Sequence, residues 1–141
     1  MSLLDKETIH RKLAVILENL QALQPILQMS REEYIADLYR RKATERLLQE
    51  LIEAAIDINI HLIVQTGHPA PDDYYESFLK AGEIQVLPTN LAEKIAPSAG
   101  LRNRLVHQYD RIDPSIVLQA VRMAEDLYPV YVKHVEEFMS N

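Results

Sequence analysis

The chain has 141 residues, of which 48% are hydrophobic and 26% charged, and its formal net charge is -6. This length and composition fit a single globular domain over residues 1–141 and exclude a disordered chain. The absence of cysteine excludes disulfides and thiolate metal sites, and the acidic balance argues against a protein that coats nucleic acid through charge alone.

The first predicted helix covers about residues 5–29. Apolar residues recur there in steps of four and three, which place them on one helical face: Ile9, Leu13, Ile16, Leu20 and Leu23. Pro25 is expected to kink this helix or to end its regular part early.

A second helical region is predicted from Ser30 to about Gly67. Ser30 and Glu33 have the spacing of a capping box, which indicates a helix start. The apolar pattern weakens across the basic run Arg40–Lys42, so a break is expected there. Gly67 is a plausible terminator.

Three short helices and a long one complete the predicted bundle. The short ones are expected at 73–81, at 91–95 with Thr89 as a candidate N-cap, and at 101–109, with a break at 97–100. Asp113 followed by Pro114 is typical of a helix start. The last helix then extends to about Phe138, with a kink expected at Pro129. The pattern predicts an all-α antiparallel helical bundle with additional short helices.

The stretch 101–113 carries the residues best suited to chemistry. Arg102 precedes His107 by five positions, about 140° around an ideal helix. Histidine transfers protons near neutral pH, and arginine offers a permanently charged fork for phosphate oxygens. RNA supplies its own nucleophile in the 2′-hydroxyl, so this pair is sufficient in kind for RNA cleavage. On spacing alone, however, a solvated helix face is the more common explanation.

These residues form the pattern Arg-x4-His-x-Tyr from Arg102 to Tyr109, which resembles the signature of HepT-like proteins in the HEPN superfamily. Two further stretches, LIEAAIDINIHLI at 51–63 and SFLKAGEIQVLP at 77–88, resemble the family's central helix and the segment after it. The three segments occur in the family's order and cover most of the chain. The resemblance implies a dimeric, all-α bundle of HEPN type.

The resemblance also implies a function. Members with the full motif are metal-independent endoribonucleases, and many are toxins of type VII-like pairs with a minimal nucleotidyltransferase antitoxin. Arg102, Asn103 and His107 take the family's catalytic positions, and Tyr109 takes that of the tyrosine whose adenylylation silences the toxin. The implied active sites lie at the interface of a homodimer that uses no cofactor and no metal. A second interpretation stays open, in which the chain is a non-catalytic helical partner or nucleotide-binding subunit of a minimal nucleotidyltransferase.

A mechanism follows as a hypothesis. His107 takes the proton of the 2′-hydroxyl or protonates the leaving oxygen, while Arg102 stabilises the charge of the transition state. Asn103 orients either His107 or the phosphate. An AMP group on Tyr109 adds negative charge that repels RNA.

Several residues have both a functional and a structural interpretation. Arg104 and Arg111 are candidate RNA contacts. Asp57 and His61 have a metal-binding spacing, but two ligands are too few, and a buried or interface polar pair is more common. Asn59 and His61 can instead lie near the active cleft.

A tyrosine pair and a basic run also have two interpretations each. Tyr74 and Tyr75 can stack on a base, although such a pair more often fills a bundle edge. The run Arg40–Lys42 can bind an RNA backbone or an acidic partner, with a solvated helix surface as the default.

The sequence shows no membrane or export signal. No window approaches 18 uncharged apolar residues, and residues 1–6 lack the basic start of a signal peptide. A cytoplasmic location with no membrane contact is expected.

Overall fold

The computed structural model describes residues 2–141, except for the side chain of Leu4. This range is helical and contains no strand, which confirms the predicted all-α class. Its elements are α1 (Leu3–Leu23), the 3₁₀ helix η1 (Gln24–Gln28), α2 (Arg31–Ala36), α3 (Leu38–Gln65), α4 (Tyr74–Glu83), α5 (Thr89–Ile95), α6 (Ser98–His107) and α7 (Pro114–Ser140).

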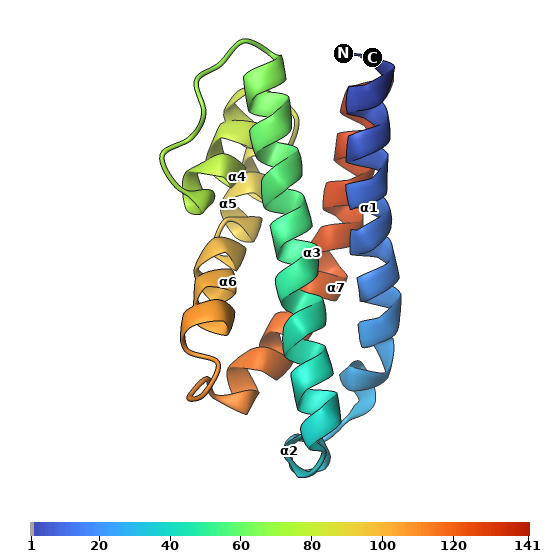
Figure 1. Cartoon of the computed structure of the whole chain (residues 1–141), viewed down its shortest axis with the longest axis vertical. Coiled ribbons are helices and arrows are strands. Elements are labelled where there is room, and N and C mark those ends of the chain that lie inside the picture. The colour runs from blue at the N-terminus through green and yellow to red at the C-terminus, as the bar shows by residue number, and fades with distance from the viewer. Residues whose placement is uncertain (1) are drawn as a thin grey trace.

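Helix α3 is the central element of the bundle. Figure 1 shows α1 on one side of it and α4, α5 and α6 on the other, while α7 begins below α6, crosses behind α3 and ends beside α1. Helix α3 contacts α1, α4, α6 and α7 directly. It runs antiparallel to α1, and α7 returns the chain end to the neighbourhood of the N-terminus (Figure 1). The predicted antiparallel bundle with additional short helices is therefore confirmed.

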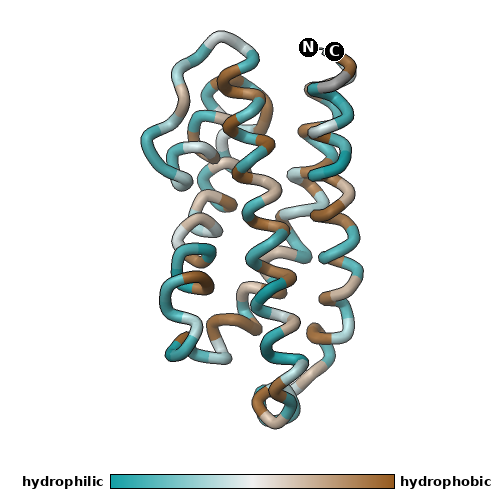
Figure 2. The backbone as a smooth tube through the Cα atoms, viewed as in Figure 1, coloured by the Kyte–Doolittle hydropathy of each residue, from teal (hydrophilic) through white to brown (hydrophobic). Residues whose placement is uncertain are grey.

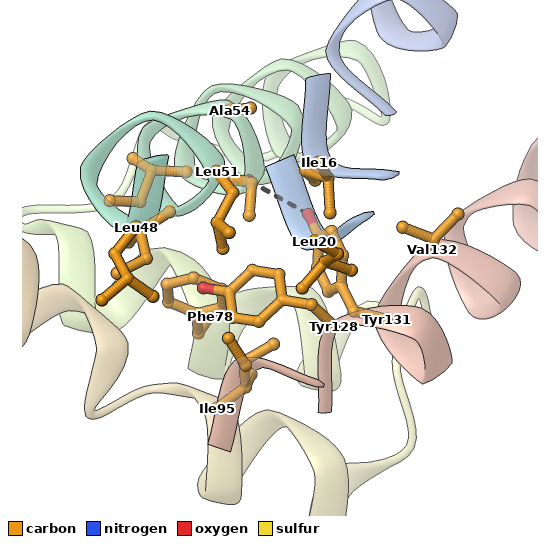
Figure 3. Close-up of a cluster of buried hydrophobic side chains, with 14 of the residues drawn as sticks. Ile16, Leu20, Leu48, Leu51, Ala54, Phe78, Ile95, Tyr128, Tyr131 and Val132 are labelled. Atoms are coloured by element: carbon orange, nitrogen blue, oxygen red, sulfur yellow. Dashed lines mark hydrogen bonds between the residues drawn. The ribbon is translucent and has the colours of Figure 1, made fainter. Parts of the chain in front are cut away.

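The core lies where these helices meet. Figure 3 shows apolar side chains from several helices in one cluster, with Tyr128 and Tyr131 of α7 beside Phe78 of α4. The Tyr131 hydroxyl lies 2.7 Å from Oδ1 of Asn59 and 3.0 Å from the carbonyl oxygen of Ala55, and its single proton is shared between these two acceptors. Asn59 is fully buried, so it belongs to this core and not to an active cleft.

Burial follows the hydropathy pattern of the sequence. Figure 2 shows apolar positions recurring at intervals along the long helices, with hydrophilic positions between them. No helix within residues 2–141 combines the length and apolar composition that crossing a membrane requires.

Capping residues explain most helix starts. The Ser30 hydroxyl accepts from the Glu33 amide at 3.1 Å, and the Glu33 carboxylate accepts from the Ser30 amide at 3.0 Å. Asp113 caps α7 through the Ser115 amide at 2.9 Å. Pro25 lies in the first turn of η1, directly after α1 ends. The capping box, the start of the last helix and the early end of the first are thus confirmed.

Three predicted boundaries were wrong. The break inside the second helical region falls at Asp37, which has an extended backbone and caps the Arg40 amide at 3.0 Å. Thr89 is the first residue of α5 and not its cap. Residues 98–100 form the first turn of α6, which has Pro97 at its N-cap position. Pro129 lies within α7, which continues on both sides of it.

Candidate active site

Helix α6 carries the motif residues and lies along α3 (Figure 1). Leu105 is buried and anchors α6 in the core. The helix ends at His107, and the Gln108 amide closes it by donating to the carbonyl oxygen of Arg104 at 2.8 Å. A short turn then leads to Asp113 at the start of α7, and buried Ile112 holds this turn against the core. Tyr109 is therefore presented just beyond the end of α6.

Arg102 points from α6 toward α3 and is held there by a carboxylate. Its Nε and Nη2 both donate to Oε2 of Glu53, at 3.0 and 2.7 Å. Its Nη1 donates to Oδ1 of Asn103 at 3.3 Å. The side chain is 18% exposed. Three of the five N–H donors of the guanidinium are thereby used, and two remain for a ligand.

Two further neighbours hold this ion pair in place. The Gln49 amide donates to Oε1 of Glu53 at 3.3 Å, so both oxygens of the carboxylate have a partner. The Tyr74 ring lies against the guanidinium, with 5.2 Å between its centroid and Cζ of Arg102. This is the geometry of a cation–π contact. Tyr74 was a candidate for base stacking, and the structure places it beside the motif arginine.

Glu53 and Gln49 are the site residues that sequence reasoning missed. Glu53 lies within the stretch that resembles the family's central helix, and Gln49 is one turn before it. Gln49 and Glu53 are four residues apart, a spacing that predicts only a contact between these two side chains on one face of the helix. Nothing in the sequence pairs Glu53 with an arginine that lies 49 positions later.

His107 and Asn103 occupy a different face of α6 from Arg102. Both side chains are exposed, and no hydrogen bond or ion pair of the His107 imidazole occurs within residues 2–141. Asn103 contacts Arg102 and not His107, so the idea that it orients the histidine finds no contact in this chain. Within the described residues, no contact between Arg102 and His107 occurs in one copy of the protein.

Tyr109 lies beside a cleft between α3 and α6. The phenol side chain is 60% exposed, and Nζ of Lys42 lies 5.8 Å from its ring centroid. The cleft has a volume of about 340 Å³, and its lining includes Arg46 and Val106. Arg104 and Arg111 lie on the same segment, and neither side chain forms an ion pair within the described range.

Asp57 and His61 each contact α1. Asp57 pairs with Lys12 at 2.9 Å, and Nε2 of His61 lies 3.1 Å from Oδ1 of Asp5. Hydrogen bonds from the hydroxyl and backbone of Ser2, with the nearby His61, lower the pKa of the Asp5 carboxyl. These contacts join α1 to α3. In the described part of the chain, no group of three histidine, aspartate or glutamate side chains is arranged to hold a metal.

The chain is similar to known proteins that belong to the family its motifs indicate. The model of the family described as "Ribonuclease HepT-like" matches residues 16–135. The tRNA nuclease HepT of Aphanizomenon flos-aquae is 37% identical over 139 residues, which cover 99% of this chain and 95% of that protein. The chain belongs to the HepT-like ribonuclease family. A relative from Archaeoglobus fulgidus, described as a putative RNase, is 30% identical over 85% of this chain and 90% of its own length.

Solved structures confirm the HEPN-type fold. The tri-AMPylated HEPN toxin of Shewanella oneidensis, in complex with its MNT antitoxin, has a TM-score of 0.82 at 22% identity and covers 97% of this chain and 99% of its own. A cytosolic protein of unknown function from Bacillus subtilis has a TM-score of 0.85 at 16% identity, covering 99% of this chain and 93% of its own. At these identities the likeness establishes the shared architecture alone.

Proposed function

We propose that this HepT-like protein is a metal-independent endoribonuclease and the toxin of a pair with a minimal nucleotidyltransferase antitoxin, acting in the cytoplasm. The observation that carries the proposal is the arrangement of Arg102. Glu53 fixes the guanidinium on one edge, and the donors on the other edge stay available for a phosphate. The family membership and the nearly full-length likeness to a tRNA nuclease support RNA as the substrate.

The reaction needs one proton acceptor, one proton donor and one cation. The 2′-oxygen attacks the adjacent phosphorus as its proton passes to a base, and the 5′-oxygen leaves with a proton from an acid. His107 serves as one of these two groups. Arg102 stabilises the negative charge on the phosphorane-like transition state. Asn103, whose amide nitrogen is free to donate, contacts a phosphate oxygen. The products carry a 2′,3′-cyclic phosphate and a 5′-hydroxyl.

A homodimer supplies the arrangement that one chain lacks. His107 is exposed while Arg102 faces α3, so a second copy that packs over the exposed face of α6 completes the site. Two copies also double the positive charge in one cleft, which offsets the acidic surface elsewhere. Arg104 and Arg111, both on this segment, are then in a position to contact the RNA backbone.

Tyr109 is the site at which the antitoxin silences the enzyme. Its phenol is accessible and lies on the motif segment, two residues after His107. Transfer of an adenylyl group from ATP to the phenol oxygen releases pyrophosphate and leaves a negatively charged phosphodiester beside the active site. This charge and bulk oppose RNA binding.

Cleavage of tRNA by the purified protein tests the proposed function. The wild type is expected to cut tRNA and to leave 2′,3′-cyclic phosphate ends, detectable by mass spectrometry of the fragments. Arg102→Ala is expected to lose at least a hundredfold in rate, because it removes a preorganised donor to developing charge. A protein free of AMP that binds a nucleotidyltransferase stably but cuts no RNA would contradict the proposal and favour a non-catalytic partner.

A further inference from the structure

The three side chains of the basic run Arg40–Lys42, at the start of α3, have different surroundings. Nε of Arg40 lies 4.0 Å from Oδ2 of Asp37, and Arg41 is turned inward, with a buried Nε. Lys42 instead reaches toward the Tyr109 ring. The structure thus separates Lys42 from its two neighbours and places it beside the motif segment.

Lys42 and Arg46 lie one helical turn apart and line the cleft between α3 and α6. Leu105, Val106 and Tyr109 form the opposite wall. Two cations therefore face an apolar wall that ends in an accessible aromatic ring. Cations along a groove with an aromatic platform are the usual composition of sites for single-stranded nucleic acid.

The cations of this cleft are available to an anion. Arg46 pairs with Glu50 at 3.2 Å, but the two side chains are 64% and 40% exposed. Such an exposed pair contributes little to stability, so a phosphate readily replaces the carboxylate. Glu45 also lines the cleft. Partial burial raises the pKa of its carboxyl, although the nearby Lys42 and Arg41 act to lower it.

Gln49 links the cleft to the site at Arg102. Gln49 lines the cleft and also donates to Glu53, which holds Arg102. From Lys42 to Glu53 the path along α3 is about 16 Å, at 1.5 Å per residue. A strand whose scissile phosphate lies at Arg102 therefore meets Lys42 and Arg46 if it follows the groove between α3 and α6.

We propose that this cleft binds the RNA backbone beside the scissile phosphate, through Lys42 and Arg46, with a neighbouring base against the ring of Tyr109. The inference rests on the proposed function and adds a substrate-binding site to it. A phosphate attached to Tyr109 would lie in the same cleft. Modification of this tyrosine would then exclude RNA by occupying a binding site as well as by adding charge.

The salt dependence of RNA binding tests this site. The probe is a short single-stranded 2′-O-methyl RNA, which lacks the nucleophilic hydroxyl and stays intact during the titration. Each cation that neutralises a phosphate of a single strand contributes about 0.7 to the slope of log affinity against log salt. Replacing Lys42 and Arg46 together with glutamine is expected to reduce the magnitude of this slope by about 1.4. Lys42→Arg is expected to preserve it.

The matched control is the double variant Lys94→Gln with Arg122→Gln. It removes one lysine and one arginine that are exposed on α5 and α7 and do not line the cleft. A double variant of Lys42 and Arg46 that keeps the slope of this control would overturn the site, and would point to an acidic protein segment as the ligand of these cations.

The proposed function is tested separately on the same preparations. If the wild type cuts tRNA and the double variant has an unchanged salt slope, the proposed nuclease activity is supported and the proposed binding cleft is contradicted. If the double variant has a reduced salt slope but the wild type cuts no RNA, the binding cleft is supported and the proposed nuclease activity is contradicted.

Discussion

At Arg102, three neighbours from three helices determine the position of one side chain. Glu53 of α3 accepts two of its hydrogen bonds, Tyr74 of α4 covers the guanidinium face, and Asn103 of α6 accepts a third bond. The motif in the sequence identifies Arg102, because motif residues are close along the chain. It does not identify Glu53 or Tyr74, because the fold alone brings them to the arginine.

Glu53 is expected to act as a positioning residue for Arg102. Glu53→Ala should lower kcat about a hundredfold, since a guanidinium displaced by about 1 Å loses much of its alignment. KM should change less, because Lys42 and Arg46 still bind the strand. Steady-state kinetics on tRNA measures both constants, with Glu93→Ala on exposed α5 as the control. An unaltered kcat in Glu53→Ala would show that the ion pair has no part in the reaction.

Glu125 gives a stability prediction with a defined pH dependence. Its Oε1 is buried without a partner, while Oε2 accepts from Gln24 at 3.4 Å. Burial, with a smaller effect of Asp126, raises the pKa of this carboxyl. The folded state therefore holds the proton more tightly than the unfolded state does. The free energy of unfolding consequently falls as the pH rises from the ordinary glutamate pKa through the raised one.

Glu125→Gln should remove this loss. The variant is expected to be more stable than the wild type by about 0.5 kcal/mol at pH 7, a small effect because the carboxyl remains partly open to solvent. The two proteins should converge below pH 4, where the wild-type carboxyl is protonated. Urea unfolding at several pH values measures the difference, with Glu136→Gln on the exposed face of α7 as control. A stability difference that does not depend on pH would refute this explanation.

At the scale of elements, helix ends with capping side chains were predictable and those without them were not. Ser30 and Asp113 are recognisable because their side-chain oxygens accept from the next turn. The break at Asp37 was not predictable, because Asp-Leu-Tyr contains neither glycine nor proline and the hydrophobic pattern weakens only in the basic run that follows. The start of α6 was placed too late because Pro97 and Gly100 suggest a turn.

The packing of α4 on α5 depends on Gly82. A Cβ at this position would lie 2.7 Å from the Cβ of Ala92 and would force the two helices apart. Gly82→Ala is therefore expected to destabilise the protein by about 2 kcal/mol, as overpacking of a buried contact does. Gly100→Ala on α6 is the control, because its Cβ meets nothing within 4 Å. That variant should be neutral or slightly stabilised.

Thermal and urea denaturation of the two alanine variants checks this prediction. Equal stability of Gly82→Ala and the wild type would mean that the two helices move apart at no cost. The contact would then not determine the position of α4, which carries Tyr74 to the active site.

For the whole molecule, hydrophobic periodicity was sufficient for the fold class and the bundle, because one apolar face per long helix dictates burial. Periodicity cannot divide apolar residues between a core and a subunit interface. The dimer therefore stays a prediction. His107 is exposed and has no contact with Arg102 within the described residues, which is the structural reason to expect that two copies are needed.

The most direct test of the central claim is RNA cleavage by the purified, AMP-free protein in the presence of EDTA, beside His107→Ala. The account predicts that the wild type cuts tRNA in EDTA and that His107→Ala does not, with unchanged helical content by circular dichroism. Cleavage that EDTA abolishes would contradict the metal-independent mechanism. Cleavage by His107→Ala at the wild-type rate would contradict the assignment of this histidine as the group that transfers the proton.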